Sequence, residues 1–157
     1  MRTIGRCIAI VLALLAASAV NASARHQIYY PSPYAPAATI IRLANSGDIK
    51  AEAQLGWMYS KGRGVPQNYY EAAHWYYLAA QRGHGGAQFE LGLMYNKGEG
   101  VRRDFVLAYF WLNLSASQAV GDDRDFKARI RDAVASKMTV EQVAAAQEMA
   151  RGWYVSR

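Results

Sequence analysis

Apolar residues recur at helical spacing through the middle of the chain, and glycine, proline and polar residues interrupt them at regular intervals. Between residues 49 and 61 the apolar positions share one side of a helix: Ala51, Leu55, Met58 and Tyr59. Gly62 follows them, where a left-handed residue ends a helix at little cost, and Pro66 stops the helix from continuing. Asn68 then has a side chain suited to a helix N-cap, so the pattern predicts a second helix over 69–82.

The second predicted helix has an apolar side of its own. We expect its inward residues to be Ala72, Trp75, Tyr76, Ala79 and Ala80. Two amphipathic helices cannot bury their apolar sides between themselves alone, so such pairs stack and share a core.

The pattern then repeats. The sequence LGWMYSKGRGV begins at Leu55 and LGLMYNKGEGV begins at Leu91, with eight of eleven positions identical and an offset of 36 residues. Gly56 and Gly92 occupy the same mid-helix register, where glycine costs about 0.5–1 kcal/mol relative to alanine. A cost repeated at one register predicts the close approach of a neighbouring helix. We place full units at 48–83 and 84–119, within a repeat region of 38–120.

The repeated pattern A-x-x-x-L-G-x-M-Y-x-K-G-x-G-V, followed by Asn68 or Asp104 and then A-x-x-W, resembles the Sel1-like repeat, a branch of the tetratricopeptide-like α/α solenoids. The resemblance implies an all-α fold, a short α/α solenoid of helical hairpins with a C-terminal helical cap at 121–157. The tail KMTVEQVAAAQEMARGW is similar to the C-terminal extension of exported bacterial members. Thr139 and Gln142 form a candidate capping box for the last helix.

The N-terminus has the features of a secretory signal peptide. Arg2 and Arg6 precede a 12-residue apolar run, and Ala22-Ser23-Ala24 supplies a small-x-small cleavage site. Residues 1–24 are therefore expected to be removed, and residues 25–37, rich in proline and tyrosine, to form a tether. An uncleaved anchor is the alternative. Cleavage implies a periplasmic or secreted protein without stable membrane insertion, and Cys7, the only cysteine, would be lost.

Composition and motifs favour binding over catalysis. Removing two arginines from 18 basic residues leaves 16 against 12 acidic residues, a net charge of +4. The basic residues are scattered, so we expect no nucleic-acid partner. No catalytic motif or metal-ligand spacing occurs, and we expect no catalytic residue, metal or cofactor. The alternative is a hydrolase acting on β-lactam or peptidoglycan-type substrates, or a binder of peptidoglycan fragments. The β-lactam activity associated with similar disulfide-rich proteins depends on paired cysteines, which the mature chain would lack.

The side of the first helix of each unit that faces away from the core is the candidate binding surface. By similarity to tetratricopeptide domains, this side lines a concave groove that grips a peptide or protein, here an envelope component. The candidate residues are Lys50, Trp57, Ser60 and Lys61 in the first unit, and Phe89, Leu93, Asn96 and Lys97 in the second. The alternative is that Trp57 and Phe89 only pack against neighbouring helices.

Export gives a direct prediction. Cleavage after Ala24 should leave Arg25 as the first residue of the mature protein. Edman sequencing of the protein from a periplasmic extract measures this, and a full-length chain in the membrane fraction would contradict it.

Overall fold

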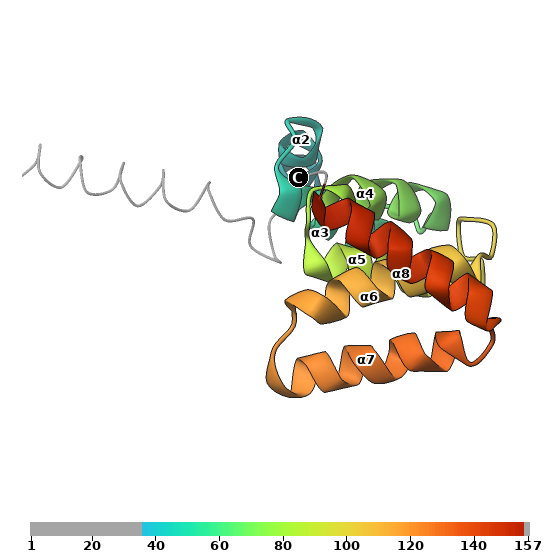
Figure 1. Ribbon diagram of the computed structural model, residues 1–157. Coiled ribbons are helices and arrows are strands. Elements are labelled where there is room, and N and C mark those ends of the chain that lie inside the picture. Colours follow the sequence, from blue (N-terminus) through green and yellow to red (C-terminus); the bar gives the residue numbers. More distant parts are fainter. Residues whose placement is uncertain (1–35, 156–157) are drawn as a thin grey trace, which may run out of the picture. The chain divides into compact units, whose positions relative to one another are not determined.

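The computed structural model describes residues 36–155, which form helices and no strand (Figure 1). The helices are α2 (Ala37–Asn45), α3 (Ile49–Lys61), α4 (Tyr69–Gln81), α5 (Gly85–Lys97), α6 (Phe105–Gln118), α7 (Gly121–Ala135) and α8 (Val140–Val155). Each helix from α2 to α6 packs on the next, and α8 packs on α6. The fold is thus the expected all-α solenoid of helical hairpins.

The predicted signal peptide and tether residues 25–35 lie outside the described residues. The tether was predicted to extend to residue 37. Its C-terminal limit was wrong, because Ala37 is the first residue of α2. Pro36 is the N-cap of this helix, and its carbonyl oxygen accepts hydrogen bonds from the N–H groups of Thr39 and Ile40. Proline is tolerated there because the first turn of a helix needs no hydrogen bond from its N–H.

The helix ends repeat with the same period as the sequence. Gly62 and Gly98 end α3 and α5 in the left-handed conformation, with φ of 66° and 79°. Asn68 caps α4 by accepting from two N–H groups, as expected. Asp48 caps α3, and at the equivalent position before α5 stands His84, whose Nδ1 accepts from the N–H of Ala87 at 3.1 Å. Burial lowers the pKa of His84, which favours the neutral imidazole that this cap requires.

Close contact between the two helices of each unit occurs at the repeated glycine. A Cβ on Gly56 of α3 would lie 2.7 Å from Cδ1 of Tyr76 on α4. A Cβ on Gly92 of α5 would lie 2.7 Å from Cγ of Leu112 on α6 and 3.1 Å from the carbonyl oxygen of Ala108. The predicted close approach is confirmed in both units, although the residue that fills the space differs between them.

A second repeated contact joins the end of the second helix of each hairpin to the start of the first helix of the same hairpin. Arg82 donates from one nitrogen to the carbonyl oxygen of Gly47 at 2.7 Å and to the buried carboxylate of Glu52 at 3.0 Å. At the equivalent positions 36 residues later, Gln118 donates to Oε1 of the fully buried Gln88 at 2.7 Å. An ion pair in one unit is thus replaced by a pair of amides in the next.

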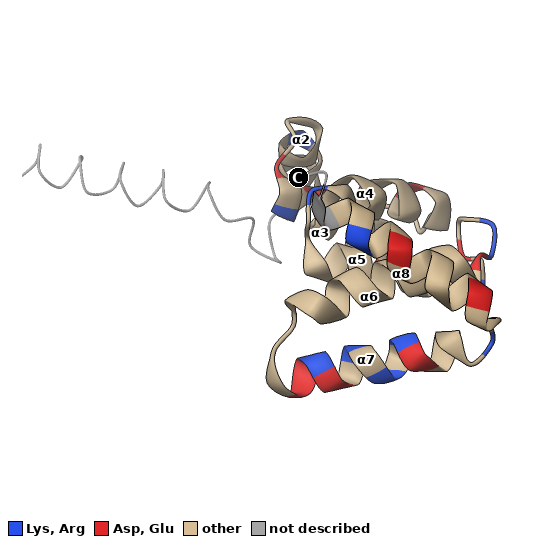
Figure 2. Ribbon diagram, in the orientation of Figure 1, with Lys and Arg blue, Asp and Glu red and all other residues tan. Residues whose placement is uncertain are grey.

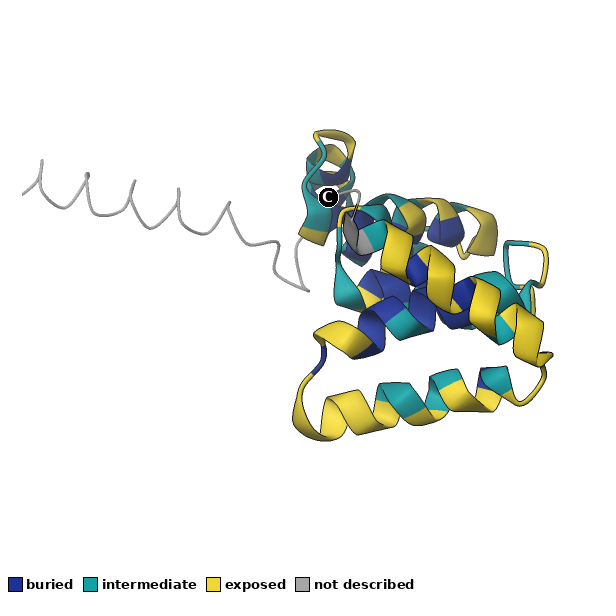
Figure 3. Cartoon of the chain, in the orientation of Figure 1, coloured by how far each residue is buried: buried dark blue, intermediate teal, exposed yellow. Residues whose placement is uncertain are grey.

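The aromatic side chains of the two units are buried unequally. Trp111 on α6 is only 4% exposed and contacts the rings of Phe110 and Trp153, with centroids 4.7 and 5.5 Å away. Trp75, its equivalent on α4, was predicted to lie in the core. It is only partly buried. The difference arises because α8 supplies Trp153 against α6. Figure 3 shows that buried residues gather on the inner helices and that α7 and α8 are largely exposed.

The C-terminal helices do not form a third tight hairpin. Both α7 and α8 pack on α6, whereas the hairpins α3–α4 and α5–α6 pack closely within themselves. The predicted capping box at the start of α8 is confirmed: the Thr139 N–H donates to Gln142, and the Gln142 N–H donates to the Thr139 hydroxyl. Among the described helices, none combines the length and apolar character that crossing a membrane requires.

The glycine contact predicts a large difference between two alanine substitutions. Gly92→Ala should lower the free energy of unfolding by about 1–3 kcal/mol, because the added methyl group overpacks the contact with Leu112 and Ala108. Gly152→Ala is the control, since a Cβ on that residue of α8 meets nothing within 4 Å. Urea unfolding followed by circular dichroism measures both. Equal stability of the Gly92→Ala variant and the parent would contradict the packing account.

Candidate functional site

The candidate residues of α3 lie at the surface. Trp57 is 39% exposed, and Lys50 and Lys61 are exposed at the two ends of the helix. Ser60 is partly buried, and its hydroxyl donates to the carbonyl oxygen of Trp57 at 2.9 Å. An exposed tryptophan is available to a partner, because its apolar area is not yet removed from water.

Three of the four candidate residues of α5 lie against other parts of the chain. The Phe89 ring is 5.8 Å from the ring of Phe126 on α7, measured between centroids. Asn96 accepts a hydrogen bond at 3.0 Å from Lys137, which follows α7. Leu93 is partly buried against the core, and only Lys97 is exposed. The structure thus separates Phe89, Leu93 and Asn96 from the more exposed Trp57, Lys61 and Lys97.

A carboxylate that the sequence did not single out links the two exposed lysines. Glu90 on α5 is partly buried, and burial raises its pKa. Lys61 of α3 and Lys97 of α5 both act on this carboxylate and oppose part of that rise. The structure therefore brings the two lysines, which are 36 residues apart, into the field of one carboxyl group. Glu90 escaped the sequence analysis because the equivalent residue of the first unit is Gln54, so no repeat drew attention to it.

The buried Tyr76 lies close to the Glu90 carboxyl group. Its side chain is 3% exposed, burial raises its pKa, and Ser60 is its hydrogen-bond partner. Trp57, Ser60, Lys61, Glu90 and Lys97 are called the Trp57 surface below. It presents one aromatic ring and two ammonium groups to solvent, beside a partly buried carboxyl group whose pKa burial raises.

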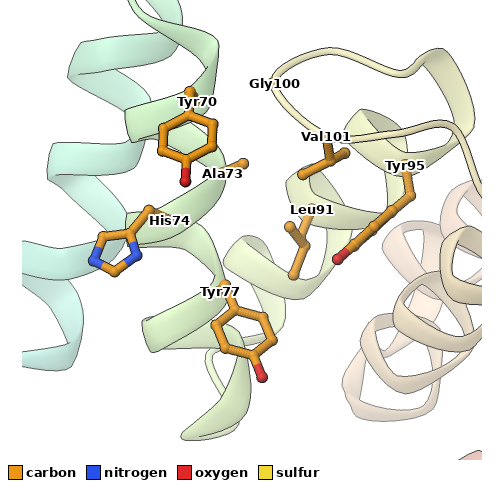
Figure 4. A pocket seen from close by; sticks show the side chains of 8 residues that line it. All are labelled: Tyr70, Ala73, His74, Tyr77, Leu91, Tyr95, Gly100 and Val101. Carbon is orange, nitrogen blue, oxygen red and sulfur yellow. The ribbon is translucent and has the colours of Figure 1, made fainter.

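A cavity of about 340 Å³ lies between α4, α5 and the loop that joins α5 to α6. Figure 4 shows Tyr70 and Tyr77 on the α4 side, with Leu91, Val101 and Tyr95 across from them. The tyrosine pocket, as this cavity is called below, is lined by Tyr70, Ala73, His74, Tyr77, Leu91, Tyr95, Gly100 and Val101. The sequence analysis missed it. Its signal was the spacing of Tyr70, His74 and Tyr77, which places three rings on one side of a helix.

Within residues 36–155 no three His, Cys, Asp or Glu side chains are grouped as a metal site would require. The groups that the described surfaces offer are aromatic rings, hydroxyls and amino groups, which recognise a partner through contact area and hydrogen bonds.

The Sel1 repeat family matches the chain at residues 49–84 and 86–120. The chain carries two Sel1 repeats. Its fold is similar to a protective antigen present in uropathogenic Escherichia coli strains that displays an SLR fold, with a TM-score of 0.67 and 30% identity over 73% of this chain. It is also similar to a Sel1 repeat protein from Oxalobacter formigenes, with a TM-score of 0.51 and 35% identity over 52% of this chain.

The chain spans 24% of the length of the first of these proteins and 63% of the second. No curated protein matches the chain in sequence. The Sel1 repeat fold is generally a protein–protein interaction module and typically a non-catalytic scaffold. The class of function expected from the sequence is therefore supported at this coarse level.

The raised pKa of Glu90 predicts how stability depends on pH. A carboxyl group whose pKa is higher in the folded chain than in the unfolded chain lowers the free energy of unfolding at a pH where it is ionised in both. This loss disappears as the pH falls through the folded-state pKa towards the ordinary value of 4.5. Glu90→Gln should therefore raise the melting temperature at pH 7, with the gain shrinking as the pH falls towards about 4.5 and absent below it. Glu148→Gln, at an exposed position on α8, is the control. A melting temperature that falls at pH 7 in Glu90→Gln would show that the lysines outweigh burial.

Proposed function

We propose that this protein is an exported, non-enzymatic interaction module that binds a segment of another envelope protein through the Trp57 surface. The observation that carries the proposal is the 39% exposure of Trp57 on a helix where the neighbouring large apolar residues Leu55 and Met58 are buried. Tryptophan is costly to leave in water and is enriched among the residues that dominate protein interfaces.

The charges beside Trp57 define the chemistry of the partner. Lys61 and Lys97 are exposed, whereas Glu90 and Glu99, whose carboxylate lies 3.7 Å from the Lys97 ammonium, are partly buried. An approaching partner therefore meets the two ammonium groups first, in keeping with the net charge of +4 expected for the mature chain. Their charge accelerates association with an acidic segment more than it increases the final affinity.

The other candidate residues act in support of this surface. Phe89 and Asn96 contact Phe126 and Lys137, so their role is to hold α5 against the C-terminal segment. Lys50 extends the cationic character to the start of α3, where it is exposed. The partner thus meets α3 and the exposed end of α5, over Trp57, Lys61 and Lys97.

Export rests on the sequence of residues 1–24, with its two arginines, short apolar run and small-x-small motif. Because the protein would be periplasmic or secreted, we infer that its partner is a component of the cell envelope. The identification of the mature N-terminus tests this part of the proposal independently of binding.

Binding is tested by crosslinking in cells from a photoreactive residue placed at the exposed Arg63, next to α3. Trp57→Ala should remove the crosslinked product while circular dichroism stays unchanged, because truncating an interface anchor costs about 2 kcal/mol or more. Lys61→Glu combined with Lys97→Glu should weaken the product most at low salt. The controls are Val140→Ala, at a residue that is 82% exposed on α8, and the paired Arg42→Glu and Arg129→Glu.

Two results would count against the proposal. If Trp57→Ala unfolds the protein, the tryptophan is a structural residue and the surface loses its anchor. If all variants fold and retain every crosslinked product, the partner binds elsewhere.

A further inference from the structure

The tyrosine pocket shares no residue with the Trp57 surface and therefore needs its own explanation. Tyr70 is 72% exposed and Tyr77 is 40% exposed, so two rings on α4 leave much of their area in water. Leu91 and Val101 supply apolar contacts on the opposite side (Figure 4). The pocket thus offers aromatic and aliphatic surfaces across a narrow gap.

The loop between α5 and α6 is built into the pocket and holds it in shape. Gly100 has a φ of 68°, and a Cβ at this position would lie 2.0 Å from the carbonyl oxygen of Tyr69. Only glycine permits such a close approach of the loop backbone to the start of α4. The wall formed by Gly100 and Val101 is therefore fixed against the helix that carries Tyr70 and Tyr77.

Two of the tyrosine hydroxyls that line the pocket are able to donate hydrogen bonds to a ligand. The Gln81 amide donates to the Tyr77 hydroxyl oxygen, which leaves the Tyr77 O–H to donate outward. Burial raises the pKa of Tyr95, so its hydroxyl also keeps its proton. No carboxylate, carboxamide, lysine or arginine side chain lines the pocket.

We propose that the tyrosine pocket binds a proline-rich segment of a partner protein in the polyproline II conformation. Such a segment has rigid rings that pack on aromatic faces, and its prolines have carbonyl oxygens but no N–H groups. Its hydrogen-bonding needs therefore match a lining that donates through Tyr77 and Tyr95. Aromatic-lined grooves are a recurring way to recognise proline-rich peptides, because the ligand is already ordered before binding.

Other classes of ligand match this lining less well. A glycan presents many hydroxyl donors and acceptors, and no carboxylate or carboxamide side chain lines the pocket to pair with them. A phosphorylated peptide is typically bound by lysine or arginine, and neither residue is in the lining. A helix satisfies its own backbone groups and would leave the tyrosine hydroxyls without acceptors.

Charged residues next to the pocket indicate which charge the ligand should carry. Arg102 and Arg103 directly follow the lining residue Val101, and both are exposed. The guanidinium carbon of Arg103 lies 5.6 Å from the centroid of the Phe105 ring. An acidic residue beside the prolines would complement this charge, with a contribution that falls as salt rises.

The probe is a labelled synthetic peptide of two glutamates followed by eight prolines, and binding to the full chain is measured by fluorescence anisotropy. Two comparison peptides replace the prolines with alternating glycine and serine, or the glutamates with serines. The proline peptide should bind at least about tenfold more tightly than the glycine–serine peptide, because its conformation is set in advance. Arg102→Glu should weaken the glutamate peptide and leave the serine–proline peptide unchanged.

Matched variants assign the binding to the pocket. Tyr70→Ala should weaken binding at least about tenfold, and Tyr77→Phe, which removes only a hydroxyl, about three- to tenfold. Tyr69→Ala and Tyr69→Phe, at the adjacent residue outside the pocket lining, should leave binding unchanged. Trp57→Ala should also leave it unchanged, so failure of this site and failure of the Trp57 surface can be told apart.

The proposal is overturned if the glycine–serine peptide binds as tightly as the proline peptide, or if neither binds. It is also overturned if Tyr70→Ala and Tyr77→Phe bind the proline peptide as the parent does. Binding of a soluble chitin oligosaccharide that is lost in Tyr70→Ala, with no binding of the proline peptide, would assign the pocket to a glycan instead.

Discussion

The close contact at Gly56 and Gly92 is the constraint on which the hairpins depend. At each position a methyl group would come within 2.7 Å of a side chain on the paired helix. The absence of Cβ sets how near the two helices of a unit lie, and the shared core of alanines and leucines is built around that separation. The mid-helix glycine costs conformational entropy, and the packing of the paired helices offsets it.

A different kind of interaction joins the two helices of each hairpin at the end where the chain enters and leaves it. The Arg82–Glu52 pair and the Gln118–Gln88 pair occupy equivalent positions and differ in charge. In each pair, a side chain at the end of the second helix of a unit donates a hydrogen bond to a buried polar side chain on the first helix. A buried polar side chain requires such a partner. The geometry of the repeat is thus kept while the chemistry of this contact changes.

Much of the fold could be predicted because the determining signals are local. The glycine, proline and asparagine residues at the helix ends act within a few residues of chain, and the 36-residue period shows that the hairpins stack. The helix limits at Ile49, Lys61 and Tyr69 follow from these signals and agree with the structure.

The candidate site was less accessible to sequence reasoning because it depends on which side chains meet across helices. The helical spacing placed Trp57 and Phe89 on one surface, but contact with Phe126 on α7 separates their environments. Glu90 lacks an equivalent in the first unit, so only the three-dimensional arrangement relates it to Lys61 and Lys97. The tyrosine pocket likewise needs the loop at Gly100 to close one side, and no periodicity reveals that contact.

The burial of α6 has a consequence for how the array ends. Residues from Ala108 to Leu112 are all buried, and α6 receives α5, α7 and α8 around its circumference (Figures 1 and 3). The two helices that follow it attach separately, and α7 carries alternating acidic and basic residues along its length (Figure 2). A further hairpin placed after α8 would find neither a tightly paired neighbour nor the glycine contact that sets helix spacing. Gene duplication could therefore lengthen this protein by inserting whole units before α5, whereas units appended after α8 would lack a paired hairpin to stack upon.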